Sequence, residues 1–247
     1  MTYPHDLEKA ALRGEPSYIW RDGQQRRLEM ILQAAGERIH GKVLEVGCGV
    51  GQYMHHLAPI AGNVTGLDFE FERVKDTLAL GLDAVNAAGE FLPYPSDSFD
   101  VVISNEVIEH VMDDNMAVAE MVRVLKPGGR LVLFCPNRGY PFETHGIYWK
   151  GKYQFGNKLF VNYLPKSMRN RLAPHVRVYS AKGLRQLFIF LPVLFVRSTI
   201  IFGGYDNFIA RLGGLGKAIR GLMQSLEHTP LRWFGLSHFW VIEKNGE

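Results

Sequence analysis

The sequence contains only two cysteines, Cys48 and Cys135, among its 247 residues. Cys48 lies in a glycine-rich stretch and Cys135 in a predicted buried strand, and neither has a partner at the spacing of a metal site or a redox pair. This scarcity excludes a fold held together by a disulfide framework. We therefore expect no metal site and a protein of the reducing cytosol.

Long apolar runs and a secretory signal are also missing. The longest apolar run covers residues 187–196, contains Pro192 and stops at Arg197, so it is too short to cross a bilayer. The first residues show no basic segment followed by an apolar one. The expected location is cytoplasmic, and a peripheral contact with a membrane is left open.

Acidic residues are scarce in the second half of the chain. Between Glu143 and Asp206 there are ten basic residues and no acidic one. Residues 1–135 carry a net charge of −8 and residues 136–247 carry +11. The second half is either a solvated basic surface or a surface that meets an anionic partner, such as a phosphorylated substrate, lipid head groups or nucleic acid.

Strands and helices are predicted to alternate through the first half. Predicted strands cover residues 43–46, 64–67, 84–86, 100–105 and 130–136, and predicted helices cover residues 23–39, 53–59, 73–79 and 107–125. The KPGG stretch at 126–129 is predicted as a turn. This alternation predicts βαβ units and a parallel sheet, and the length of the chain fits one α/β domain.

The pattern loosens after Pro136. Residues 137–174 are expected to form a long loop or small lid with short helices. Further predictions are a helix at 180–187, a strand at 193–202, a helix at 207–226 and a strand at 237–244. The expected organisation is one domain with four parts: an N-terminal helical cap (1–40), a core with the alternating strands and helices (41–137), a lid (138–190) and a helical insertion (204–236).

The stretch VLEVGCGVGQY carries glycines at 47, 49 and 51 directly after a predicted strand. A dinucleotide fold requires G-x-G-x-x-G, with the third glycine three residues after the second. Here Gln52 occupies that position. Glu45, two residues before the first glycine, would repel a pyrophosphate and attract an ammonium or sulfonium group. The pattern argues against a dinucleotide.

Asp68 ends the second predicted strand, 21 residues after Gly47. A carboxylate there can accept hydrogen bonds from both hydroxyls of a ribose, and Phe69 is positioned to pack on the attached base. Together with Glu45, these residues predict a pocket for a nucleoside that carries a cationic tail.

These stretches resemble the class I S-adenosylmethionine (SAM)-dependent methyltransferases, in particular the type 11 group. The matching stretches are VLEVGCGVG, GLD, GEFLPYPSDSFDVVISNEVIEHV and VLKPGGRLVLFCPN, in the family's order between residues 43 and 137. The resemblance implies a Rossmann-like, doubly wound, seven-stranded and mostly parallel sheet with an antiparallel last strand. A lid would follow the fifth strand, and a helical insertion would lie between the sixth and seventh. The implied cofactor is SAM, with S-adenosylhomocysteine as its product.

The resemblance also implies which residues bind the cofactor. They are Glu45, Gly47, Cys48 and Gly49 by the methionine part, Asp68 by the ribose, Phe69, Gly89 and Glu90 by the adenine, and Asn105 beneath the sulfonium. One position departs from the family pattern, because Ala88 stands where an aspartate usually meets the adenine amino group. That departure weakens the expectation for Glu90.

Two histidines are candidates for a catalytic base, should the acceptor be a hydroxyl. His145 lies on the segment expected to roof the acceptor site, with Glu143 placed to orient it or to bind substrate. His110 follows the fourth strand, and a structural role is the alternative for both. Upstream, Tyr18 and Trp20 either cover the methyl group or pack on a helix.

The leading hypothesis is methyl transfer to a small molecule, through a hydroxyl of an amphiphilic or anionic acceptor such as a lipid-linked sugar, a quinone-like compound or a polyketide-like compound. An RNA methyltransferase is the alternative that the basic half allows, although nucleic acid is disfavoured because SNEVIE replaces the Asn-Pro-Pro-aromatic signature. A SAM-binding protein without turnover is the third. A monomer and a homodimer are both compatible with the sequence.

The helix predicted at 207–226 is amphipathic and basic. Apolar residues recur at helical spacing, while Arg211, Lys217 and Arg220 carry charge without a nearby acid. Such a helix can lie on an anionic membrane or cover an apolar substrate. The alternative is that its apolar face packs on the domain's own core or on a second subunit.

Overall fold

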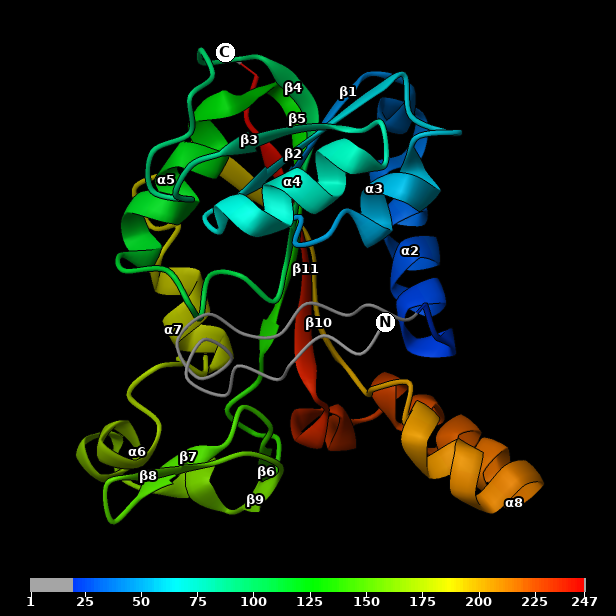
Figure 1. Ribbon diagram of the computed structural model, residues 1–247, viewed down its shortest axis with the longest axis vertical. Helices are drawn as coiled ribbons and strands as arrows, with labels where there is room; N and C mark the ends of the chain where they lie inside the picture. Colours follow the sequence, from blue (N-terminus) through cyan, green and yellow to red (C-terminus); the bar gives the residue numbers. More distant parts are fainter. Residues whose placement is uncertain (1–19, 247) are drawn as a thin grey trace.

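Seven strands form one sheet in the order β10-β11-β5-β4-β1-β2-β3 in the computed structural model, which describes residues 20–246 (Figure 1). The strands are β1 (Lys42–Val46), β2 (Asn63–Asp68), β3 (Asp83–Asn86), β4 (Phe99–Asn105), β5 (Leu125–Pro136), β10 (Val193–Ile201) and β11 (Ser237–Lys244). β11 pairs antiparallel with both β5 and β10, and the pairs among β1 to β5 are parallel. The predicted sheet, including its antiparallel last strand, is confirmed.

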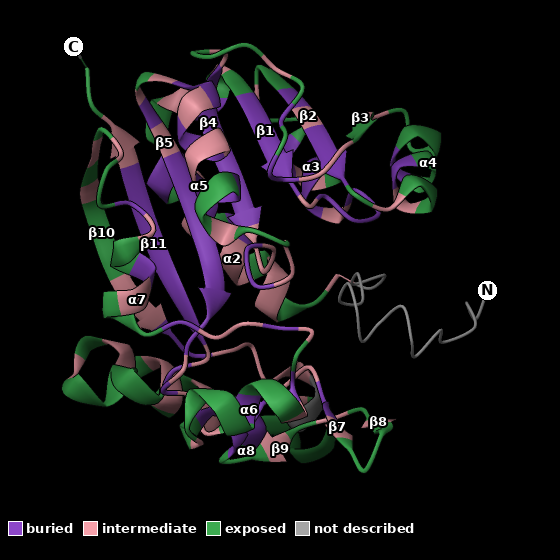
Figure 2. Cartoon of the chain, turned by 90° about the vertical axis from the view of Figure 1, so that its left-hand side faces the viewer, coloured by how far each residue is buried: buried purple, intermediate pink, exposed green. Residues whose placement is uncertain are grey.

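Helices cover both faces of the sheet, because side chains alternate between the faces along each strand. Val43 of β1 packs with α2 (Asp22–Ala35) and α3 (Gln52–Leu57) in one buried cluster. Leu44 packs with α5 (Asp114–Val124) and α7 (Ala181–Gln186) in the other. The 3₁₀ turn η1 (Gly36–His40) follows α2, and α4 (Phe71–Ala79) contacts β2 and β3. Figure 2 shows the central strands buried between these layers.

The prediction of one helix over residues 107–125 is wrong at its start. Residues 107–113 form turns, and α5 begins only at Asp114. The cause is the side chain of Asp113, which accepts hydrogen bonds from the backbone N–H groups of Asn115 and Met116 and so caps the helix. The segment that carries Glu109 and His110 is therefore a loop at the end of β4.

The prediction of a turn over KPGG is also wrong, because β5 begins at Leu125 and includes all four residues. Gly128 has φ of 74° there, and the pairing with β4 shifts register between Phe99 and Val101. A left-handed glycine accommodates this irregularity without steric cost.

A small lid follows β5, as predicted. The short strands within the lid were not predicted. β6 (Phe142–Glu143) pairs with β9 (Lys158–Leu159), and β7 (Ile147–Trp149) pairs with β8 (Lys152–Gln154). The turn η2 (Val161–Tyr163) and helix α6 (Lys166–Leu172) complete it. The chain then returns to the sheet through α7, whose first turn is capped by the side chain of Ser180.

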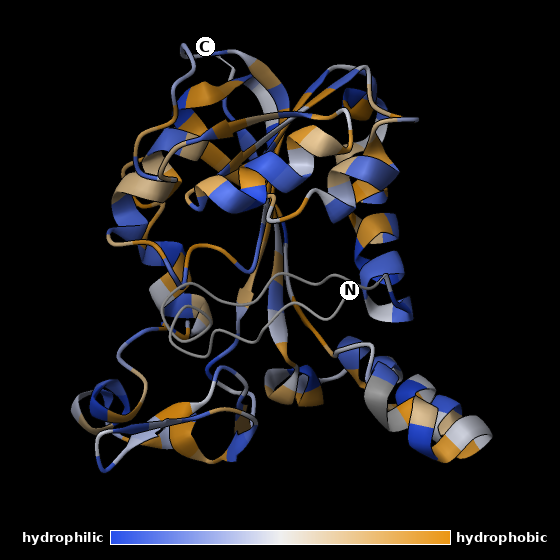
Figure 3. Cartoon of the chain, in the orientation of Figure 1, coloured by the Kyte–Doolittle hydropathy of each residue, from blue (hydrophilic) through white to orange (hydrophobic). Residues whose placement is uncertain are grey.

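The predicted helical insertion between the last two strands is present. It consists of α8 (Asp206–Ser225), with non-helical backbone at Gly213, and the turns η3 (Leu226–His228) and η4 (Pro230–Phe234). Figure 1 shows α8 pointing away from the sheet, and Figure 3 shows polar and apolar residues mixed along it. Leu212, Leu215 and Leu222 are exposed, so these three side chains do not pack on the domain's own core, whereas Ile219, Met223 and Leu226 are half-buried.

Within residues 20–246, no helix combines the length and the apolarity that a bilayer crossing requires.

Candidate active site

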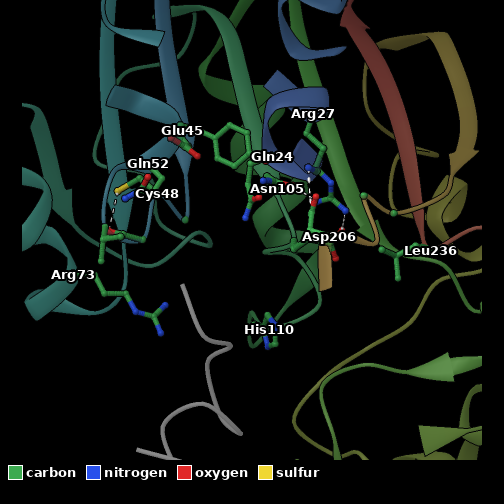
Figure 4. A pocket seen from close by; sticks show the side chains of 18 of the residues that line it. Gln24, Arg27, Glu45, Cys48, Gln52, Arg73, Asn105, His110, Asp206 and Leu236 are labelled. Atoms are coloured by element: carbon green, nitrogen blue, oxygen red, sulfur yellow. Dashed lines mark hydrogen bonds and ion pairs between the residues drawn. The ribbon is translucent and has the colours of Figure 1, made fainter. Parts of the chain in front are cut away.

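A cavity of about 400 Å³ lies at the carboxyl ends of β1 and β4. The start of α2, the segment before α8 and the lid contribute to its walls. Among the predicted site residues, those that line it are Glu45, Gly47, Cys48, Gly49, Asn105, His110 and His145. In Figure 4 the labelled side chains surround a common space, with Glu45 and Cys48 on the side of the glycine turn and Arg27 and Asp206 opposite.

The glycine turn requires glycine for its backbone. Gly47, Gly49 and Gly51 all have positive φ, between 56° and 75°, where other residues are strained. A Cβ on Gly47 would also lie 2.3 Å from Cγ2 of Val107. These positions therefore bring bare backbone to the cavity wall.

Glu45 places a buried carboxylate in the cavity wall. Its side chain is 3% exposed, and its Oε2 atom has no hydrogen-bond partner among residues 20–246. Burial and the neighbouring charge of Asp68 raise the pKa of Glu45 to about 8. A ligand ammonium group would satisfy this orphaned oxygen and favour its ionised form, so the site fits the methionine part of SAM.

Four predicted cofactor residues do not line the cavity. Asp68 accepts backbone N–H bonds from Gly49 at 2.9 Å and from Glu70 at 2.9 Å, so it holds the glycine turn. Phe69 beside it is 60% exposed. Gly89 lies against Val46 and Val111.

Glu90, the fourth of these residues, supports the loop after β4. Its Oε1 accepts hydrogen bonds from the backbone N–H groups of Met112 at 2.6 Å and Asp113 at 3.2 Å. The contacts of Asp68, Phe69, Gly89 and Glu90 with the nucleoside stay predictions.

Arg27 of α2 connects three parts of the site. It donates hydrogen bonds to Asn105 Oδ1, to Glu106 Oε1 at 2.8 Å and to Ser237 Oγ at 2.8 Å. Ser237 in turn donates to Glu106 at 2.6 Å. Glu106 has a φ of 57°, a strained conformation for a non-glycine residue that these contacts help to hold.

Trp20 takes the second of its two predicted roles, which is packing on a helix. Trp20 stacks on His56 with 3.8 Å between ring centroids and meets Tyr53 edge-on. It therefore packs on α3, and Tyr18 lies outside the described residues.

His145 is held by its neighbour on the lid. Its Nδ1 atom lies 3.0 Å from Oε1 of Glu143, and Arg169 donates to Oε2 of Glu143 at 2.6 Å. Burial would raise the pKa of Glu143, but the bond to His145 and the charge of Arg169 lower it to about 2. An ionised Glu143 favours the tautomer of His145 that carries its proton on Nδ1, and Nε2 is the lone-pair nitrogen of that tautomer.

His110 packs edge-on against His145 at the cavity wall, with 5.2 Å between the ring centroids. Burial and the nearby His145 lower the pKa of His110 to about 3, so its imidazole is neutral. Its Nδ1 atom is buried and has no hydrogen-bond partner in the part of the chain that the structure describes.

Several residues that line the cavity were not predicted from the sequence. They include Gln24, Arg27, Arg73, Asp206 and Leu236. Asp206 accepts a hydrogen bond from the backbone N–H of Gly23, 183 positions earlier. No local pattern signals a contact over that separation. Arg27 stands next to Arg26 on the helix predicted over residues 23–39, and the local pattern does not distinguish the two.

The core of the chain is similar in sequence to known proteins. Residues 44–133 match the family model described as a methyltransferase domain. A "probable S-adenosylmethionine-dependent methyltransferase" of Mycolicibacterium smegmatis is 39% identical over 116 residues, which are 46% of this chain and 45% of the relative. A ubiquinone biosynthesis O-methyltransferase of Xanthomonas oryzae pv. oryzae is 35% identical over 114 residues, 43% of this chain and 46% of the relative. The chain thus spans under half the length of these relatives.

The fold is shared over nearly the whole chain. The crystal structure of an S-adenosylmethionine-dependent methyltransferase from Mesorhizobium loti superimposes with a TM-score of 0.63, covering 90% of this chain and 98% of that one at 17% identity.

Proposed function

Because the chain belongs to the class I SAM-dependent methyltransferases, we propose that it transfers the methyl group of SAM to an oxygen atom of a small-molecule acceptor. The observation that carries this proposal is the composition of one cavity. A buried carboxylate without a partner in the described chain, Glu45, lies on one side, and an oriented imidazole, His145, lies on the other.

On the cofactor side, Glu45 binds the ammonium group and the glycine turn gives the ligand access to backbone. Asn105, fixed by Arg27, borders the space between the two sides. When bound, SAM supplies a methyl group activated on a sulfonium. Since methyl transfer is an in-line displacement, the main task of these residues is to position the reacting atoms.

On the acceptor side, Nε2 of His145 is the group that can take the proton of a hydroxyl. Glu143 holds the ring and its tautomer in the way that a carboxylate orients a catalytic imidazole. The Xanthomonas relative is named an O-methyltransferase, which supports an oxygen acceptor.

A second cavity supports an anionic acceptor. It has a volume of about 480 Å³, lies between the lid and α7, and is lined by Arg138, Lys166, Arg169 and Arg177, with Asp114 as its acidic residue. Four of the 16 basic residues of the second half line it. A phosphate or carboxylate of the acceptor would meet the positive charge of these side chains, and Lys166 and Arg138 could bond to it.

A peripheral membrane contact is supported by α8, whose exposed leucines lie beside the exposed Arg211 and Lys217. Exposed apolar side chains flanked by basic ones suit an anionic lipid surface. We therefore propose that the acceptor is lipid-linked and that α8 holds the enzyme at the membrane that contains it.

The function is tested by incubating the protein with methyl-labelled SAM and separate lipid, polar and RNA extracts. We expect label in the lipid or polar fraction, in a linkage that behaves as a methyl ether or ester. Label confined to RNA would replace the proposal by RNA methylation. SAM binding without label in any fraction would support a binding protein without turnover.

A further inference from the structure

Three polar side chains converge where the loop after β4 meets the lid. One ligand atom each of Glu109, His110 and His145 lies within 4.8 Å of the other two. Glu109 is 1% exposed, and neither of its carboxylate oxygens has a hydrogen-bond partner among residues 20–246. The cluster therefore contains a buried acid and a buried imidazole nitrogen, that of His110, which no described protein group satisfies.

A buried carboxylate without a partner is costly, so it is neutralised either by a proton or by a cation. Arg27 is bonded to Glu106 rather than to Glu109. The single positive charge of Arg27 therefore balances Glu106 and leaves Glu109 without a counter-charge. A divalent cation would balance the carboxylate of Glu109.

The distances suit a metal ion. An ion about 2.1 Å from each ligand atom brings neighbouring ligands to about 3.0–3.5 Å of one another. Side chains whose ligand atoms already lie within 4.8 Å reach that geometry by small rotations.

The hydrogen bonds around His145 are also of the kind that orients metal-binding histidines. A metal-binding histidine donates its second ring N–H to a carboxylate or carbonyl in most sites. Nδ1 of His145 bonds to Glu143, which Arg169 anchors in turn. His145 can therefore present Nε2 to the ion with its ring already oriented.

We propose that Glu109, His110 and His145 bind a divalent first-row transition metal ion at the acceptor end of the cavity, and that this ion binds the acceptor oxygen. Two imidazoles and one carboxylate favour Co²⁺, Zn²⁺ or Mn²⁺ over Mg²⁺, which prefers oxygen ligands and water. Metal binding at this site does not depend on the proposed methyl transfer, whereas the catalytic role of the ion rests on that proposed function.

With the ion bound, the metal replaces His145 as the group that activates the acceptor hydroxyl, because an Nε2 atom that ligates a metal cannot also accept a proton. The ion lowers the pKa of the acceptor hydroxyl, whose proton leaves to water. An oxygen lone pair then forms the new O–C bond while the S–C bond breaks, and its electron pair stays on sulfur. Three protein ligands leave open positions, so an acceptor with two adjacent oxygens, such as a catechol or vicinal diol, can occupy two of them.

The test is metal binding by the chelator-treated wild-type protein without SAM, followed by calorimetry and visible absorption with Co²⁺. We expect one Co²⁺ per chain and weaker binding of Mg²⁺. Glu109→Gln and His110→Asn should each lower the Co²⁺ affinity at least tenfold. Glu72→Gln and His40→Asn, at exposed positions away from the cavity, are the matched controls and should bind as the wild type does.

The site is ruled out if the wild type binds no Co²⁺, or if both cluster variants bind it as tightly as the controls. Circular dichroism identifies a variant that fails to fold. In that case the Co²⁺ affinities of the other variant and of the wild type still test the site. SAM titration of the same preparation tests the proposed function separately, because Glu45 lies outside the cluster. If Co²⁺ binds but chelation leaves methyl transfer unchanged, the catalytic role of the ion is ruled out.

Discussion

Nη2 of Arg27 lies 2.8 Å from Oε1 of Glu106, although 79 positions separate the two residues in the chain. This ion pair joins α2, which precedes the sheet, to the carboxyl end of β4. The loop that carries Glu109 and His110 begins there. Since both side chains are largely buried, the pair couples the position of α2 to the shape of the cavity.

Removal of this pair should destabilise the protein. Arg27→Ala leaves the Glu106 carboxylate buried without its cation, and we expect the free energy of unfolding to fall by about 2–4 kcal/mol. Urea denaturation measures the loss. Lys75→Ala, which breaks the exposed pair with Glu72, is the control and should cost under about 1 kcal/mol. Equal effects of the two variants would contradict the structural role of Arg27.

Glu45 should make the stability of the free protein depend on pH. Its pKa of about 8 lies above that of an unfolded glutamate, so the native state binds the extra proton between pH 4.5 and 8. The stabilising contribution is complete below this window and disappears as the pH rises through it. Relative to Glu45→Gln, the wild type should therefore lose stability from pH 5 to pH 8, which denaturation at several pH values measures. Parallel curves for the two proteins would refute the assignment.

Asp68 should be needed for SAM binding. Asp68→Ala removes the acceptor that holds Gly49 and the carboxylate predicted to bind the ribose, and we expect the affinity for SAM to fall about tenfold or more. Calorimetry measures it, with Asp83→Ala on the exposed start of β3 as the control. An unchanged affinity would remove Asp68 from the site, and tighter binding of NAD than of SAM would overturn the cofactor assignment.

His145→Ala should reduce turnover far more than cofactor binding, by a factor on the order of 10² to 10⁴. The imidazole faces the acceptor side of the cavity, whereas Glu45 and the glycine turn bind the cofactor. Glu143→Gln should have a smaller effect in the same direction, because it loosens the ring without removing it. A loss of turnover for His110→Ala with none for His145→Ala would reverse the assignment.

The membrane contact of α8 should depend on charge. We expect the protein to sediment with anionic vesicles at low salt, and to be released at high salt or by the double variant Arg211→Glu/Lys217→Glu, because each basic residue near the surface contributes about 1 kcal/mol. Lys42→Glu/Lys75→Glu, at exposed positions of β1 and α4, is the matched control. Protein that stays in the supernatant with anionic and neutral vesicles alike would rule out the contact.

Much of the fold was predictable because the relevant signals are local. The apolar runs of β1 and β4 and the glycines of the turn determine backbone conformation within a few residues, and β11 was predicted with the bounds that the structure has. The start of α5 was missed because Val107, Ile108 and Val111 continue an apolar pattern while the cap of Asp113 determines where the helix begins.

The candidate site was predictable only in part, for a related reason. Glu45 and Asn105 lie at the carboxyl ends of single strands, so their positions come from those strands alone. The cluster of Glu109, His110 and His145 depends on how the lid folds back over the loop after β4. No spacing in the sequence carries that information, and the expectation of no metal site rested on the cysteines alone.

The position of β11 has a consequence for biosynthesis. This strand lies between β5 and β10 and supplies Ser237, which bonds to both Arg27 and Glu106. A nascent chain that has not yet released residues 237–244 from the ribosome cannot join β10 to the sheet. The acceptor end of the cavity is therefore completed only after nearly all of this sequence has been translated, so partly synthesised chains should be unable to assemble the reactive centre.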